Sequence, residues 1–178
     1  ADTDGQVLTY GGAPIQAVFF SSAAGSTADA AEVWGRSLPY LVPVDSPEGE
    51  EVPNYRSTVT LTADEVRKLA ETEGLGCDLS GEPSGWFTNV VRSASGRVAS
   101  LSLGGASLSG GAARSLFSLR SACFDVSEAE GVFTFSVTGY GHGVGMSQYG
   151  ANAMAKAGSG WREIVAHYYT GAAIQTGI

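Results

Sequence analysis

The chain has 178 residues, of which 43% are hydrophobic and 16% are charged, so it is not an intrinsically disordered chain, and a single folded domain over residues 1–178 is predicted. Ten basic and eighteen acidic residues give a formal net charge of −8, which disfavours nucleic acids and anionic lipids as partners. No apolar run approaches the roughly 18 residues of a membrane-spanning helix, so no transmembrane segment is predicted.

The first part of the chain predicts a hairpin, a loop and a helix. Strands over residues 6–10 and 13–20 flank Gly11-Gly12, a dipeptide that accepts the positive φ angles of a tight turn. Residues 38–55 are rich in proline and are predicted to form a surface loop. A capping box from Thr62 to Glu65 then predicts a helix that ends near Gly74. Three glutamates of the loop form a charge run that is typical of a solvated segment: Glu48, Glu50 and Glu51.

The middle of the chain predicts further strands. Residues 87–92 and 97–103 flank a Ser-Ala-Ser-Gly turn and form a second hairpin. Alternation in its second strand directs Val98 and Leu101 or Leu103 toward a core. Residues 132–140 alternate small polar with larger apolar side chains, which predicts a half-buried strand.

Two helices are predicted at the C-terminal end. Residues 148–157 are rich in alanine and stop at Gly158, and residues 161–169 stop at Gly171. Ile164, His167 and Tyr168 share one face of the second helix, which favours His167 as a hydrogen-bonded core histidine. The predicted fold class is α+β, with antiparallel hairpins forming a mixed sheet and a few packed helices, two of them C-terminal.

The two cysteines, Cys77 and Cys123, are too far apart in sequence and too isolated from histidines for a zinc site. A single disulfide is the preferred interpretation, and two buried free thiols are the alternative. No metal or cofactor is predicted.

The stretch GYGHGVGMSQYGA, residues 139–151, holds five glycines between a strand and a helix that begins at about Ser147. Glycines remove side chains and leave His142 as a large polar group on a bare surface. This arrangement indicates a binding or catalytic floor, with a tight strand-to-helix connection as the alternative. The Lys-Ser/Thr ending and the acidic ribose partner of phosphate-binding loops are absent.

Three segments of the sequence carry a family resemblance. GYGHGVGMSQYGANAMAKAG followed by WREIVAHYYTG resembles the C-terminal signature of the stage II sporulation protein D (SpoIID) domain family, which includes amidase enhancers. FFSSAAGSTADAAEVWGRSLPYLVPVDSP resembles an upstream part of that domain, and GRVASLSL with LFSLRSACFDV resembles a later part. The resemblance covers nearly the whole chain.

The resemblance implies a secreted or membrane-tethered protein of the bacterial cell envelope. Members of the family act on peptidoglycan glycan strands. The lytic transglycosylases among them cleave the MurNAc-GlcNAc bond to give a 1,6-anhydro product. A cell-wall amidase is the further partner that the amidase enhancers suggest.

One departure from the family pattern bears on catalysis. The family's general-acid glutamate lies in a Glu-Met-Pro motif, which this sequence lacks, so the chain is expected to begin after that segment. Whether the chain is itself an enzyme is therefore open. The alternative function is a non-catalytic glycan-binding or amidase-activating module.

Candidate site residues follow from the motifs. Glu32, between a polar loop and Trp34, is the best candidate for a replacement acid in this chain, although a solvated surface glutamate is the preferred interpretation. Trp34 and Tyr40 are either sugar-stacking or core aromatics. The predicted substrate-binding residues are Ser21, Ser22, Gly141, His142, Gly143, Gln148 and Tyr149.

Overall fold

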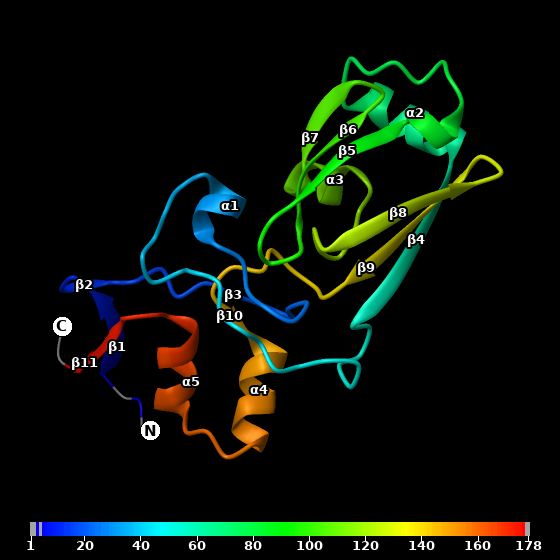
Figure 1. The fold of residues 1–178 in the computed structure, drawn as a ribbon. Coiled ribbons are helices and arrows are strands. Elements are labelled where there is room, and N and C mark those ends of the chain that lie inside the picture. The colour runs from blue at the N-terminus through cyan, green and yellow to red at the C-terminus, as the bar shows by residue number, and fades with distance from the viewer. Residues whose placement is uncertain (1–2, 4, 177–178) are drawn as a thin grey trace. The chain divides into compact units, whose positions relative to one another are not determined.

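The computed structural model describes residue 3 and residues 5–176, and the chain divides into two compact units. The first unit comprises residues 1–48 and 143–178, and the second comprises residues 49–142. Figure 1 labels the elements of both units. The predicted α+β class is confirmed, because the described residues contain five α-helices and eleven strands.

The first unit is assembled from the two ends of the chain. Its elements are β1 (Gln6–Tyr10), β2 (Ala13–Pro14), β3 (Phe19–Phe20), α1 (Ala30–Trp34), β10 (Met146–Ser147), α4 (Gln148–Lys156), α5 (Trp161–Tyr168) and β11 (Ala173–Thr176). Strand β1 lies between β11 and β2 in an antiparallel sheet, so strands near both ends of the chain pair directly. The hairpin at Gly11-Gly12 is confirmed, but its second strand is short, and β3 pairs instead with β10 in parallel.

Side chains from both chain segments of this unit form its core. Leu41, Val144 and Tyr168 are almost fully buried there, and Ile164 packs with them from α5. Figure 1 shows α4 and α5 as neighbouring helices. Both predicted C-terminal helices are therefore confirmed, each within one residue of its predicted end.

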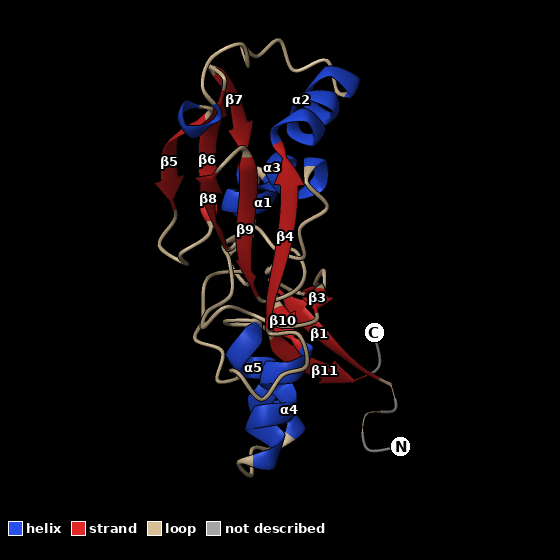
Figure 2. Ribbon diagram, turned by 90° about the vertical axis from the view of Figure 1, so that its right-hand side faces the viewer, coloured by secondary structure: helices blue, strands red, loops and turns tan. Residues whose placement is uncertain are grey.

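The second unit holds two three-stranded antiparallel sheets. Its elements are β4 (Arg56–Thr62), α2 (Ala63–Thr72), the 3₁₀ turn η1 (Pro83–Gly85), β5 (Phe87–Arg92), β6 (Val98–Leu103), β7 (Ala106–Ser109), α3 (Gly110–Leu116), β8 (Phe124–Ala129) and β9 (Val132–Thr138). The strand orders are β4-β9-β8 and β5-β6-β7. Figure 2 shows β4 and β9 as long neighbouring strands of the first of these sheets.

Alternation in β9 explains how this unit builds its core. Phe133, Phe135 and Val137 are at most 2% exposed, and the residues between them point away from the core. The rings of Phe117 and Phe135 stack with centroids 4.8 Å apart, and Trp86 stacks on Phe133 at 5.5 Å. The predicted strand and the predicted 87–103 hairpin are both confirmed.

The loop predicted over residues 38–55 contains no helix or longer strand, but it is not simply solvated. Tyr40 and Leu41 are buried in the first unit, and Val52 is buried in the second. Glu48, which was expected in solvent, is only 4% exposed. The prediction of a solvated charge run is therefore wrong for Glu48, although Glu50 and Glu51 are exposed.

The preferred disulfide prediction is wrong, because Cys77 and Cys123 are both free thiols. Cys77 lies in the segment after α2 and packs partly against the core of the second unit. Cys123 precedes β8, where its Sγ lies 3.8 Å from the Gly96 carbonyl oxygen. Burial raises the pKa of the Cys123 thiol, so the uncharged thiol is favoured there.

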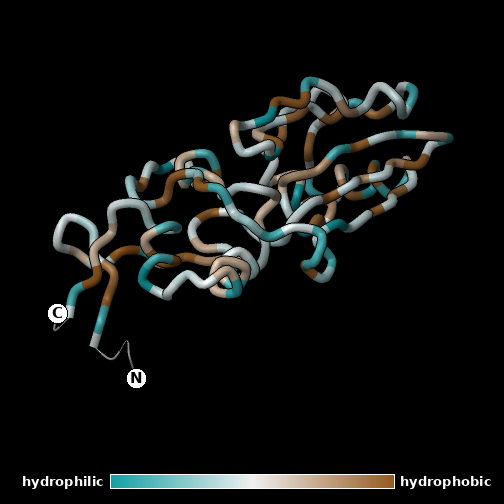
Figure 3. The backbone as a smooth tube through the Cα atoms, turned by 60° about the horizontal axis from the view of Figure 1, so that its bottom comes forward, coloured by the Kyte–Doolittle hydropathy of each residue, from teal (hydrophilic) through white to brown (hydrophobic). Residues whose placement is uncertain are grey.

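Hydrophobic residues are interspersed with polar ones along the chain trace, as Figure 3 shows. Among the helices that the structure describes, none combines the length and the apolar character needed to cross a membrane.

Candidate functional site

The predicted substrate-binding residues fall in both units. Ser21, Ser22, Gly143, Gln148 and Tyr149 belong to the first unit. The remaining two, Gly141 and His142, are the last residues of the second unit.

A parallel strand pair positions the serine loop beside the start of α4. Phe19 and Phe20 of β3 pair with Met146 and Ser147 of β10. Immediately beyond this pair, the Tyr149 backbone N–H donates to the Ser21 carbonyl at 3.1 Å. Two polar motifs that are more than 120 residues apart in sequence are thereby held together.

Ser147 is the N-cap of α4. Its hydroxyl oxygen accepts a hydrogen bond from the Gly150 backbone N–H at 3.2 Å, as an N-cap side chain does. The same hydroxyl hydrogen-bonds the Glu48 carboxylate. The start of α4 is thus tied to the segment that carries Glu48.

Glu48 joins this helix start to the serine loop. Its Oε1 atom accepts from the Ala23 backbone N–H at 2.6 Å as well as from Ser147. The other carboxylate oxygen, Oε2, is buried and has no hydrogen-bond partner among the described residues. A carboxylate with these bonds is a framework group that fixes both segments of the candidate site.

Gly150 permits close packing around this carboxylate. A Cβ atom at Gly150 would overlap the Tyr168 hydroxyl, the Ser46 hydroxyl and the Oε2 atom of Glu48. The Tyr168 and Ser46 hydroxyls are 2.8 Å apart and hydrogen-bonded. Burial raises the pKa of Tyr168 to about 12, with the hydrogen bond between Tyr168 and Ser46 opposing the shift and the Glu48 charge adding to it.

The glycines before β10 serve backbone contacts. The Gly143 carbonyl accepts from the Ala28 N–H at 2.8 Å. This hydrogen bond joins the segment just before α1 to the glycine stretch. Gly145 has a φ of +77°, and a Cβ atom there would collide with the Val18 carbonyl oxygen. Some of these glycines are therefore explained by close backbone approach, the alternative that the sequence left open.

Two residues in or next to the β3–β10 strand pair are exposed to solvent. Gln148 is exposed at the first position of α4, and the Phe19 side chain on β3 is 57% exposed. Tyr149 and Ser21 are half-buried, whereas Ser22 is only 1% exposed. Gln148 and Phe19 are therefore the residues of this region best placed to touch a ligand.

The other candidates of the first unit lie on or near α1. Glu32 is exposed in the first turn of that helix, and Trp34 at its last position is 43% exposed. Tyr40 is 8% exposed, and its hydroxyl accepts from the Gln16 N–H at 3.2 Å. Of the two aromatics, Trp34 is therefore available at the surface and Tyr40 belongs to the core.

The two histidines have different settings. His142 is half-buried at the end of the second unit, where the preceding Gly141 N–H donates to the Arg120 carbonyl at 2.9 Å. His167 on α5 is half-buried, and its Nε2 atom is 2.6 Å from the Asp45 carbonyl oxygen. The hydrogen bond predicted for His167 is confirmed, but the predicted core position is wrong, because the side chain is only half-buried.

Sequence reasoning missed two residues of this region. Phe19 falls in the strand predicted over residues 13–20 and was not singled out, although its side chain is exposed. Glu48 lies in a Pro-Glu-Gly-Glu-Glu run that is typical of a solvated loop. No local signal marked Glu48 for burial, because the segment that resembles the family ends one residue earlier, at Pro47.

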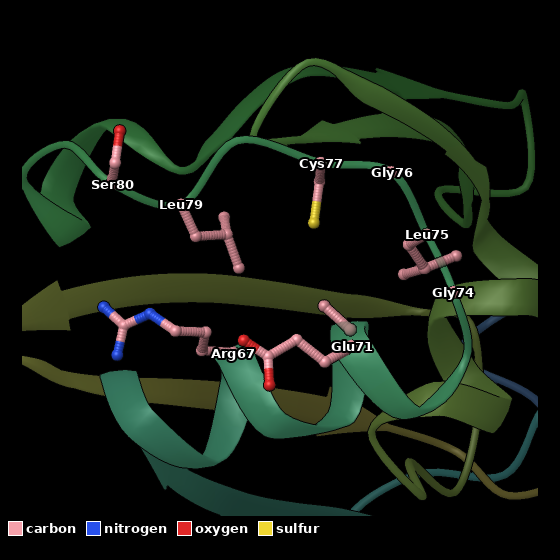
Figure 4. A pocket seen from close by; sticks show the side chains of 9 residues that line it. Arg67, Glu71, Gly74, Leu75, Gly76, Cys77, Leu79 and Ser80 are labelled. Carbon is pink, nitrogen blue, oxygen red and sulfur yellow. The ribbon is translucent and has the colours of Figure 1, made fainter.

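A separate cavity of about 460 Å³ lies in the second unit beside α2 (Figure 4). Arg67 and Glu71 of α2 line it together with Leu79 and Cys77, whose side chain points toward the helix in Figure 4. Arg67 also pairs with Asp64 at 2.5 Å. None of the predicted substrate-binding residues lines this cavity. Within the described part of the chain, no cluster of three or more histidine, cysteine or acidic side chains is suited to a metal ion.

Comparison with known proteins tests the family resemblance. No protein-family model matches the chain. Stage II sporulation protein D from Bacillus amyloliquefaciens is 40% identical over 172 residues, which are 96% of this chain and 48% of that protein. The protein of the same name from Bacillus subtilis (strain 168) is 39% identical over 175 residues, 98% of this chain and 49% of the relative.

A weaker match is the amidase enhancer of Bacillus subtilis (strain 168), 27% identical over an alignment of 227 residues that covers 95% of this chain and 31% of that protein. The chain thus spans about half the length of the stage II sporulation relatives that it matches. These similarities extend over nearly all of the chain and agree with its motifs, so the chain belongs to the stage II sporulation protein D family.

Proposed function

We propose that the chain is a sporulation-related cell-wall protein that works outside the cytoplasm and binds peptidoglycan glycan strands. The observation that carries the proposal is the exposed surface at the β3–β10 pair, where motif residues shared with the family present Phe19 and Gln148 to solvent. An exposed aromatic ring stacks on the apolar face of a sugar, and an amide hydrogen-bonds its hydroxyls. Such contacts recognise the sugar ring itself and do not require charge on the strand.

The proposed reaction of the whole protein is lytic transglycosylation of these strands. That reaction needs a carboxylic acid to protonate the glycosidic oxygen and then to assist attack by the 6-hydroxyl of the muramic acid residue. Glu48 is buried and its carboxylate accepts a hydrogen bond from the Ala23 backbone, whereas Glu32 is exposed on α1. We therefore assign substrate binding to the residues of this chain, and the acid to the Glu-Met-Pro glutamate of family members that possess it.

Pulldown with purified peptidoglycan sacculi tests the binding proposal. We expect Phe19→Ala and Gln148→Ala each to weaken retention by about 3- to 10-fold, because each change removes one contact worth about 1 kcal/mol. Asn152→Ala is the matched control, since Asn152 is exposed on the same helix as Gln148. Melting temperatures should match the unchanged protein. Absence of retention at low salt, or equal losses in the control, would contradict the proposal.

The second candidate is a module that enhances a cell-wall amidase, which the amidase enhancer relative favours. Mass spectrometry of sacculi digested with and without a purified amidase separates the two functions. Anhydro-muramyl products formed by this chain alone would support an enzyme and bring Glu32 forward as its acid. Faster release of peptides by the amidase, without anhydro products, would support the enhancer.

A further inference from the structure

A hollow of about 320 Å³ in the second unit lies apart from the cavity beside α2. Its size is at the lower end of small-ligand sites, which span about 300 to 1,000 Å³. It is lined by Arg114, Ser115, Ser118, Leu119, Arg120 and Tyr140.

A tight turn after α3 brings the two arginines of this hollow together. Ser118 adopts a left-handed φ of +53°, and the Leu119 N–H donates to the Arg114 carbonyl at 2.8 Å. Leu119 is 4% exposed and anchors the turn in the core. The Arg120 carbonyl then accepts from Arg114 Nε at 3.1 Å and from the Gly141 N–H at 2.9 Å. Arg120, which lines the hollow, is therefore hydrogen-bonded directly to the glycine stretch of the family motif.

The charge of the hollow differs from that of the whole chain. Arg56, Arg67 and Arg92 each pair with a carboxylate. Among the residues that the structure describes, no ion pair is formed by the half-buried Arg114 or Arg120. Two guanidinium groups thus share one hollow without a countercharge, in a chain with eighteen acidic residues. A guanidinium is a planar fork of donors that matches a carboxylate in a bidentate geometry.

Tyr140 adds an aromatic face to this cationic hollow. Its side chain is 48% exposed, and the Arg120 guanidinium carbon lies 5.2 Å from its ring centroid. An aromatic ring beside a guanidinium suits a ligand with both an apolar ring face and an anionic group. The serine hydroxyls of Ser115 and Ser118 can hydrogen-bond sugar hydroxyls.

We infer that this hollow is a binding subsite for a sugar carboxylate, with Arg120 and Arg114 holding the carboxylate and Tyr140 stacking on the ring. In peptidoglycan glycan strands from which the stem peptides have been removed, the sugar that carries a free carboxylate is muramic acid, through its lactyl ether. This identification of the sugar rests on the proposed function, whereas the carboxylate chemistry rests on the two guanidinium groups.

Titrations of the ¹⁵N-labelled chain with single sugars test the inference by NMR. The Gly141 amide is the reporter, because it donates to the Arg120 carbonyl. We expect N-acetylmuramic acid to bind at least 10-fold more tightly than N-acetylglucosamine, which lacks the lactyl carboxylate. Arg120→Met should remove that difference while leaving the weak binding of N-acetylglucosamine unchanged. Arg162→Met is the matched control, because Arg162 is exposed on α5 and should leave the difference intact.

Several results would overturn the inference. Equal binding of the two sugars would do so, as would an unchanged preference in an Arg120→Met variant with a normal melting temperature. Inorganic phosphate that binds as tightly as N-acetylmuramic acid would replace the sugar subsite with a general anion site. If Arg120→Met fails to fold, Tyr140→Ala replaces it, because Tyr140 is exposed and its loss should weaken both sugars.

The subsite and the proposed function fail differently. Retention on sacculi without a preference for N-acetylmuramic acid would sink the subsite alone. A preference for N-acetylmuramic acid without retention on sacculi would sink the proposed function alone.

Discussion

Glu48 is the residue on which the candidate site of the first unit depends most. Its carboxylate accepts from the Ala23 backbone and from Ser147, so it holds the serine loop against the start of α4. Removing this buried acceptor leaves the Ala23 N–H without its partner and leaves the Ser147 hydroxyl only the Ser21 carbonyl, at 3.3 Å. Each hydrogen bond lost in this way costs about 1–3 kcal/mol.

We therefore predict that Glu48→Ala lowers the free energy of unfolding by about 3 kcal/mol or more. Glu48→Gln keeps one acceptor oxygen and should lose less. Glu51→Ala is the control from the same charge run, where an exposed side chain should change stability by less than about 0.5 kcal/mol. Urea denaturation measures all three, and equal effects of Glu48→Ala and Glu51→Ala would show that the carboxylate is not a framework group.

The environments of individual side chains were the hardest feature of this structure to predict from the sequence. Glu48 is buried by partners 25 and 99 residues away, while its own neighbours are those of a solvated loop. The two cysteines raised the same problem, because a sequence gives their number and spacing but not their separation in space. Gln148, by contrast, follows an N-cap serine, so its place at an exposed helix start could be predicted from local signals.

Among the elements, α2 shows how local signals fix a helix. Thr62 accepts from the Glu65 N–H at 3.3 Å, and the Glu65 carboxylate accepts from the Thr62 N–H at 2.7 Å. This reciprocal capping box satisfies two backbone donors at the first turn. These hydrogen bonds lower the pKa of Glu65, mainly through the Thr62 backbone, so the ionised form is favoured.

We predict that Thr62→Ala lowers the free energy of unfolding by about 1 kcal/mol, the usual cost of losing an N-cap side chain. Lys68→Ala on the exposed face of the same helix is the control and should have little effect. Thermal melting followed by circular dichroism compares the two. Identical melting temperatures for both variants would mean that the cap is not needed for the stability of α2.

Elements whose local signals conflict or are absent could not be predicted. Helix α3 begins with Gly110 and Gly111, which disfavour a helix, and yet Ser109 caps it at 3.1 Å through the Ala112 N–H. Gly110 is needed because a Cβ atom there would collide with the Val98 carbonyl. The two-residue strands β3 and β10 likewise depend on pairing across 127 residues, which no local pattern reveals.

At the scale of the whole molecule, the two units differ in what fills their cores. The first unit buries Tyr168 and Tyr169, and burial raises the pKa of each to about 12. The core cluster described for the second unit contains phenylalanines and Trp86 but no tyrosine. Since the folded tyrosines bind their protons more tightly than unfolded ones with a pKa near 10, the first unit's stability is intact below pH 10 and falls as the pH rises toward 12.

We predict that alkaline pH unfolds the first unit before the second. The test uses a Trp34→Phe, Trp161→Phe variant in which Trp86, 2% exposed, is the remaining tryptophan and reports on the second unit. It also carries Cys123→Ala, which removes the thiol with a raised pKa from the second unit. Between pH 10 and 12, circular dichroism should decrease while Trp86 keeps the emission of a buried indole. Adding Tyr168→Phe should reduce the pH dependence, because one of the two titrating groups is gone. A red shift of Trp86 emission in step with the loss of circular dichroism would contradict the prediction, since it would mean that the two cores unfold together.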